Sequence, residues 1–148
     1  MKRLFKYYPE DFKDLPVKVL HMDLIFDVYD NYTNVKSKLR AKSLSTPISK
    51  LELNAKNLEV ISISVEDYET EYKYKLDENK IIITFNKSLH PNTEFVINTE
   101  TICRPTKNIL EGLYYDETPP GAPPQQITQC QQWGFQRLVP CFDDMMAK

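Results

Sequence analysis

The hydrophobic and polar residues between positions 17 and 99 alternate with a period of two, which is the pattern of half-buried β-strands. In residues 35–42, small or apolar side chains occupy the odd positions and basic side chains the even ones. We interpret the basic face as a solvated sheet surface or as protection of a strand edge, rather than as a ligand site. An earlier strand is predicted to place five side chains on one face: Leu20, Met22, Leu24, Phe26 and Val28.

Short segments rich in turn residues separate the strands. They lie at Asp30-Asn31, at residues 54–57, at residues 77–80 and at residues 89–92. No helical period of useful length occurs before residue 100. About seven short strands at this spacing predict an all-β domain, built as an antiparallel sheet or sandwich. We place this domain at residues 17–148 and treat residues 1–16, which show no clear period, as an N-terminal strap.

A proline-rich segment follows the last clear strand. Four of the ten prolines lie within residues 118–124, which read Thr-Pro-Pro-Gly-Ala-Pro-Pro. Such a segment alone would indicate a linker or a polyproline ligand. Because an apolar segment with a cysteine follows it directly, we expect a fixed loop between two strands.

Composition and charge exclude several function classes. The 148 residues fit one domain, and the net charge of −2 comes from acidic and basic residues that are mixed along the chain, so a nucleic-acid partner is not expected. The sequence contains no run of eighteen apolar residues, so no membrane span is predicted, and the N-terminus lacks the apolar core of a signal peptide. The three cysteines are odd in number and lack C-x-x-C spacing, which indicates reduced thiols and a cytoplasmic protein.

Candidate chemistry is sparse. The two histidines, His21 and His90, lie far apart in sequence, and no H-E-x-x-H, G-x-S-x-G or P-loop motif occurs. We therefore expect no catalytic residue, no metal ligand and no cofactor within this chain. The nine tyrosines suggest a binding platform, but tyrosine is also common in half-buried strands, and we favour that structural role.

The C-terminal third carries a resemblance to a known family. Its residues read Thr128-Gln129-Cys130-Gln131, then Arg137, then Pro140-Cys141-Phe142-Asp143-Asp144, and last Lys148. This resembles the segment that closes the N-terminal domain in the aminopeptidase N and leukotriene hydrolase family of zinc peptidases. Weaker matches to that family lie at Gly112-Leu113-Tyr114, at residues 51–58 and at residues 21–24.

The resemblance implies a saddle-like, mainly antiparallel β-domain that is packed against a separate zinc-bearing catalytic domain. That domain would be the main partner of this chain, would hold the zinc ion, and would follow Lys148 in the parent protein. On this basis we expect the chain to be inactive alone, as the non-catalytic part of a zinc aminopeptidase.

The resemblance also implies candidate site residues. In the family, a side chain of the last strand helps to bind the free N-terminus of the peptide substrate, and the matching position here is Gln131. Gln129 lies two residues earlier, so we expect both glutamines on one strand face with Cys130 pointing inward. Most family members carry Glu at the position of Gln131, and a neutral amide gives up the charge assistance of that bond.

Two further expectations concern the end of the chain. Arg137 and Asp143 are predicted to form an ion pair, either between domains or solvated at the chain end. An isolated domain is also expected to expose an apolar patch around Trp133, Phe135, Val139 and Phe142, with self-association as a consequence.

Two alternative functions stay open. The chain could be a free-standing β-sandwich adaptor that binds protein partners through its tyrosine-rich face or its proline loop. It could also be a hydrolase that uses Cys130 or Cys141, although no histidine lies nearby in sequence to activate either thiol.

Overall fold

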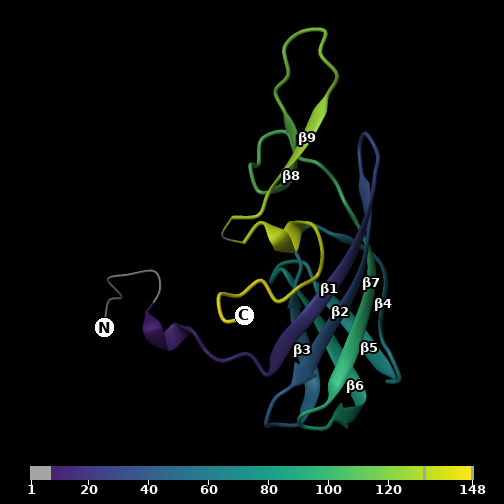
Figure 1. Cartoon of the computed structure of the whole chain (residues 1–148), viewed down its shortest axis with the longest axis vertical. Coiled ribbons are helices and arrows are strands. Elements are labelled where there is room, and N and C mark those ends of the chain that lie inside the picture. Colours follow the sequence, from purple (N-terminus) through teal and green to yellow (C-terminus); the bar gives the residue numbers. More distant parts are fainter. Residues whose placement is uncertain (1–7, 132, 148) are drawn as a thin grey trace.

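The computed structural model describes residues 8–131 and 133–147, and its regular secondary structure consists almost entirely of antiparallel β-strands (Figure 1). The larger sheet has the order β1 (Val17–Val28), β2 (Thr33–Ser43), β7 (Glu94–Cys103) and β4 (Glu59–Val65). The smaller sheet has the order β3 (Ile48–Asn54), β6 (Lys80–Leu89) and β5 (Thr70–Lys75). Short 3-10 turns occur at η1 (Pro9–Asp11) and η2 (Phe135–Arg137). The predicted all-β antiparallel sandwich is confirmed.

The core lies between the two sheets, because each contributes the apolar face of its strands. In β2 the predicted alternation is confirmed: Val35, Leu39 and Ala41 are buried, whereas the basic residues between them face solvent. In β6, Ile81 and Ile83 are fully buried on the facing side. The side-chain period of two therefore decides which residues meet across the sandwich.

In β1 the predicted inward face is partly wrong. The register against β2 shifts between Val19 and His21, so Leu20 is the extra residue of a β-bulge. Val17 and Val19 point inward before the bulge, and Met22 and Leu24 point inward after it. Leu20 is 42% exposed, because one inserted residue reverses the face that each following side chain occupies.

The predicted turns are confirmed. The segment between β5 and β6 ends with Asn79 at a φ of 53°, and the segment between β6 and β7 contains Asn92 at a φ of 57°. Asparagine tolerates this left-handed conformation better than most residues. None of the helical turns in the described residues has the length and apolar character needed to cross a bilayer.

The proline-rich segment joins two strands of a separate ribbon, as expected. The ribbon consists of β8 (Gly112–Asp116) and β9 (Gln125–Gln129), and it projects from one end of the sandwich (Figure 1). At its tip the Ala122 N–H donates to the Pro119 carbonyl at 3.0 Å, and Gly121 has a φ of 86°. Proline followed by a glycine of positive φ fits a type II β-turn, so the tip is a fixed turn and not an extended polyproline segment.

The C-terminal segment closes the sandwich beside β3. Asn54 and Cys141 exchange two backbone hydrogen bonds, of 2.7 and 3.0 Å, which form an isolated antiparallel bridge. The Lys56 N–H donates to the Gln136 carbonyl at 2.8 Å. Residues 1–7 of the predicted strap, Gln132 and Lys148 lie outside the described residues.

This closure makes the predicted apolar patch wrong for two of its members. Val139 has no exposed surface and Phe142 is 9% exposed, because both turn inward and join the core. Phe135 is partly buried against the same core, whereas Trp133 remains 37% exposed. An apolar residue that fills a core cannot be told from one that faces a partner by composition alone.

Candidate functional site at the base of the ribbon

The two predicted site glutamines lie where the ribbon joins the sandwich. Gln129 is the last residue of β9, and Gln131 lies in the turn that follows it. Both side chains are exposed, and Cys130 between them is partly buried against the core, as expected. Because the strand ends at Gln129, the two glutamines do not share one strand face. They are presented instead by a strand end and the adjoining turn.

One face of the ribbon rests on the turn between β1 and β2. The Tyr115 hydroxyl donates to the Asp30 carbonyl, and the Gln126 side-chain amide donates to the Tyr29 carbonyl at 2.9 Å. Gln129 lies three residues after Gln126, so its side chain alternates to the opposite face of β9. The ribbon therefore anchors itself with one face and leaves the face of Gln129 open.

Two glycines allow the chain to pass closely at the base of the ribbon. A Cβ at Gly134 would overlap the Gln129 carbonyl oxygen and would lie 3.0 Å from the Cys130 Cα. A Cβ at Gly112, which has a φ of 69°, would lie 2.6 Å from the Arg137 Cβ. Gly112 is also the register partner of Gln129. The backbone of Gln129 and Cys130 thus lies directly against Gly134, the residue that precedes η2.

The ion pair expected between Arg137 and Asp143 is corrected by the geometry. The Arg137 Nε donates to the Glu111 carboxylate at 3.0 Å, and the Arg137 side chain is only 10% exposed. The Asp143 carboxylate instead accepts a bond of 3.1 Å from the Gln136 N–H. The 3-10 turn η2 explains this. It directs the Arg137 side chain toward Glu111, just before β8, and leaves Asp143 beside the backbone N–H of Gln136 in η2.

Asp143 belongs to the structural support of the site. Its N–H donates to the Asn54 side-chain oxygen at 3.2 Å, which ties the segment to β3. Partial burial raises the pKa of the Asp143 carboxyl, although the bond from the Gln136 N–H acts in the opposite direction. Asn54, Glu111 and Gly134 were not singled out as site residues from the sequence. Gly134 offered a signal, since glycine marks positions of close backbone approach.

The cysteines do not form a nucleophilic site. Burial raises the pKa of the Cys103 thiol to about 11. The pKa values of Cys130 and Cys141 are also raised, mainly by burial and to a smaller extent by the nearby charge of Asp143. A thiol with a raised pKa is a poor nucleophile at neutral pH. The exposed His21 ring bonds to Asp23 at 3.0 Å on β1. The raised thiol pKa values, together with a His21 ring that is paired with Asp23, argue against a cysteine hydrolase.

The tyrosine platform of the adaptor alternative is not formed by Tyr68 and Tyr74. Tyr68 packs edge-on against Phe85 with ring centroids 5.8 Å apart, and both tyrosines pack against the core. The Tyr74 hydroxyl accepts from the Leu58 N–H at 3.2 Å. These two tyrosines are structural, as favoured from the sequence.

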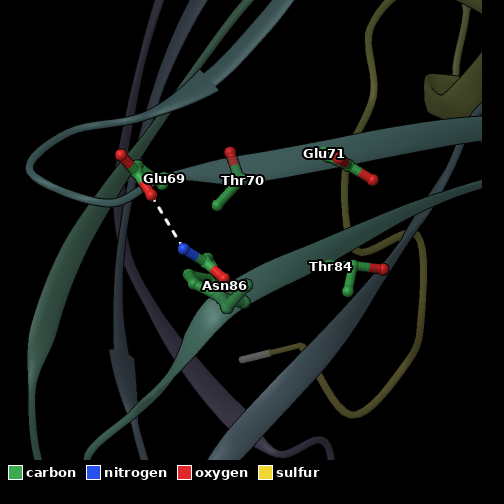
Figure 2. Close-up of a pocket in the computed structure, with 6 residues that line it drawn as sticks. Glu69, Thr70, Glu71, Thr84 and Asn86 are labelled. Carbon is green, nitrogen blue, oxygen red and sulfur yellow. Dashed lines mark hydrogen bonds between the residues drawn. The ribbon is translucent and has the colours of Figure 1, made fainter.

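A separate hollow of about 500 Å³ lies on β5 and β6 (Figure 2). The Asn86 side chain donates to the Glu69 carboxylate at 2.8 Å. Figure 2 shows this bond as a dashed line, with Glu71 pointing away from the pair. The hollow belongs to the smaller sheet, whereas the glutamines belong to the ribbon. It therefore adds nothing to the candidate site.

Comparison with known proteins places these features in a family. Residues 12–148 match the family model described as the Peptidase M1 N-terminal domain. The chain is also 22% identical over 144 residues to leukotriene A-4 hydrolase from Xenopus laevis, across 95% of this chain and 23% of that protein. The chain thus spans about a quarter of the length of the curated relative that it matches.

Proposed function

Because the chain belongs to the family of peptidase M1 N-terminal domains, we propose that it is the non-catalytic domain of a zinc aminopeptidase. In this proposal the chain forms one wall of the substrate cleft, and its partner is the catalytic domain of the same protein. The side-chain oxygens of Gln129 and Gln131 accept hydrogen bonds from the free ammonium group of a peptide. The single observation that carries the proposal is the exposure of both glutamines, at the end of β9 and in the turn that follows it, within a segment that matches the family.

The geometry suits recognition of a free N-terminus. An exopeptidase must bind an ammonium group and exclude longer chains, and oxygen acceptors at the closed end of a cleft do both. Gly134 and Gly112 let the backbone beside the glutamines lie close to η2. A backbone that is already packed leaves mainly the two side chains to be ordered on binding.

We assign the zinc ion to the partner domain. In residues 8–131 and 133–147, no group of three or more His, Cys, Asp or Glu side chains lies together in a way that could hold a metal ion. When bound in the partner, zinc would polarise the peptide carbonyl and activate water. The residues of this chain would orient the substrate.

The test compares peptides with free and acetylated N-termini in the full-length protein that contains this chain. Gln129→Ala and Gln131→Ala should each lower kcat/KM for the free peptide by about tenfold or more, since a hydrogen bond to a charged group contributes about 1.5–3 kcal/mol. Any slow turnover of the acetylated peptide should not change. Gln125→Ala is the matched control, because Gln125 is also exposed but lies at the other end of β9. Equal rates for all three variants and the unaltered protein would refute the proposal.

A further inference from the structure

Arg137 connects the start of the ribbon to the segment that closes the sandwich. Its side chain is 10% exposed, whereas its partner Glu111 is 50% exposed. The bond between the Arg137 Nε and the Glu111 Oε2 measures 3.0 Å. A charge-assisted bond with one enclosed partner is stronger than an exposed ion pair, because less solvent competes for it.

The aliphatic stem of Arg137 also lies directly beneath the backbone of Gly112. A Cβ at Gly112 would lie 2.6 Å from the Arg137 Cβ and 3.2 Å from its Cδ. Gly112 pairs with Gln129 across the ribbon, and Glu111 immediately precedes Gly112. The Arg137 side chain therefore contacts both the Glu111 carboxylate and the Gly112 backbone, at the start of the strand that pairs with Gln129.

We propose that Arg137 is a positioning residue for Gln129 and Gln131, an inference that rests on the proposed function. It sets the angle at which the base of the ribbon leaves the sandwich, and so sets where the two amides meet a substrate ammonium group. Displacement of a binding group by about 1 Å can lower activity by about a hundredfold. Arg137 would not touch the substrate itself.

The fold separates this positioning role from general stability. Three other connections hold the closing segment to β3 and its loop: the Asn54–Cys141 bridge, the Lys56–Gln136 bond and the Asn54–Asp143 bond. The outer part of the ribbon keeps its own anchor, in which Tyr115 and Gln126 bond to the turn between β1 and β2. Loss of the Arg137 charge should therefore let the base of the ribbon pivot without unfolding the domain.

Two variants remove the ion pair in different ways. Arg137→Met keeps an unbranched stem beneath Gly112 and removes the charge. Glu111→Gln leaves Arg137 in place and removes the partner's charge, so it serves if the first variant folds poorly. Arg40→Met is the matched control, because Arg40 is 53% exposed on the outer face of β2 and lies 3.8 Å from Asp23.

The experiment measures kcat/KM for free and acetylated peptides in the full-length protein, and backbone hydrogen exchange of residues 112–116 and 125–129. Each ion-pair variant should lower kcat/KM for the free peptide about tenfold and speed exchange in the ribbon, whereas Arg40→Met should change neither. In a background of Gln129→Ala with Gln131→Ala, Arg137→Met should cause no further loss, because it acts through those side chains.

The outcomes separate the two proposals. If the glutamine variants lose activity but Arg137→Met and Glu111→Gln keep wild-type kcat/KM, only the positioning role is wrong. An additive loss in the glutamine-free background would also overturn it. If the glutamine variants keep full activity, the proposed function fails, and the positioning role fails with it.

Discussion

The backbone of Gly134 lies so close to the carbonyl oxygen of Gln129 that a Cβ at position 134 would overlap it. Gly134 has a φ of −74°, which any residue can adopt, so this glycine is required for space alone. Gly121 is the opposite case, because its φ is 86° but nothing lies within 4 Å of an added Cβ. Gly112 combines both constraints, with a φ of 69° and Arg137 at 2.6 Å.

These three glycines predict a graded series of alanine substitutions. Gly121→Ala should destabilise by about 1 kcal/mol, since a left-handed L-residue costs about 1–2 kcal/mol and alanine recovers part of this through the unfolded state. Gly134→Ala should cost about 1–3 kcal/mol through overpacking. Gly112→Ala should cost most. Urea unfolding checks this order, and a Gly121→Ala variant less stable than Gly112→Ala would contradict it.

A buried hydroxyl predicts a stabilising substitution. Thr101 has no exposed surface, its Oγ1 has no hydrogen-bond partner among the described residues, and its register partner Val35 is equally buried. Thr101→Val keeps the shape and removes the unpaired group, so stability should rise by about 1 kcal/mol or more. The reciprocal Val35→Thr should lower it by about 1–3 kcal/mol. A loss of stability in Thr101→Val, measured in urea, would show that the hydroxyl is in fact paired.

The thiols predict a pH effect on stability. The folded pKa of Cys103 is about 11, above the ordinary value of 9.0, because burial disfavours the thiolate. The folded state therefore keeps its proton where the unfolded state loses it, so stability is full below about pH 9 and falls as pH rises toward about 11. Cys103→Ala should show a shallower loss over this range. If the free energy of unfolding, measured with a chemical denaturant, falls equally steeply with pH in both proteins, the raised pKa of Cys103 would be contradicted.

Thiol labelling gives an independent prediction on the same residues. Cys130 is partly exposed, whereas Cys103 and Cys141 are 2% and 4% exposed. At pH 8 a thiol reagent should modify Cys130 first, and the other two should react only on unfolding. Mass spectrometry of the labelled peptides checks the order.

The neutral amide at position 131 predicts a gain on charging it. Gln131→Glu in the full-length protein should raise kcat/KM for peptides with a free N-terminus by about tenfold, because a charge-assisted bond is roughly twice as strong as a neutral one. Gln125→Glu adds the same charge at the other end of β9 and controls for long-range attraction. If both variants raise the rate equally, the effect is general electrostatics and not contact with the ammonium group.

The strands and turns could be predicted because they depend on local chemistry. In β2 the alternation of Val35, Leu39 and Ala41 with basic residues specifies one buried face, and asparagines such as Asn79 mark the turns. The bulge at Leu20 could not be predicted, because it depends on how β1 pairs with β2. No pattern within β1 itself distinguishes an inserted residue from a paired one.

The antiparallel sandwich, the fixed proline turn and the segment that resembles the family could be predicted from the order of residues, since each depends on residues that are neighbours in the chain. The folded structure was needed to show that Arg137 pairs with Glu111 and not with Asp143, and that Val139 and Phe142 fill the core. These outcomes depend on where η2 meets the ribbon and β3. Contacts between residues far apart in the chain are set by packing in three dimensions, which local spacing does not encode.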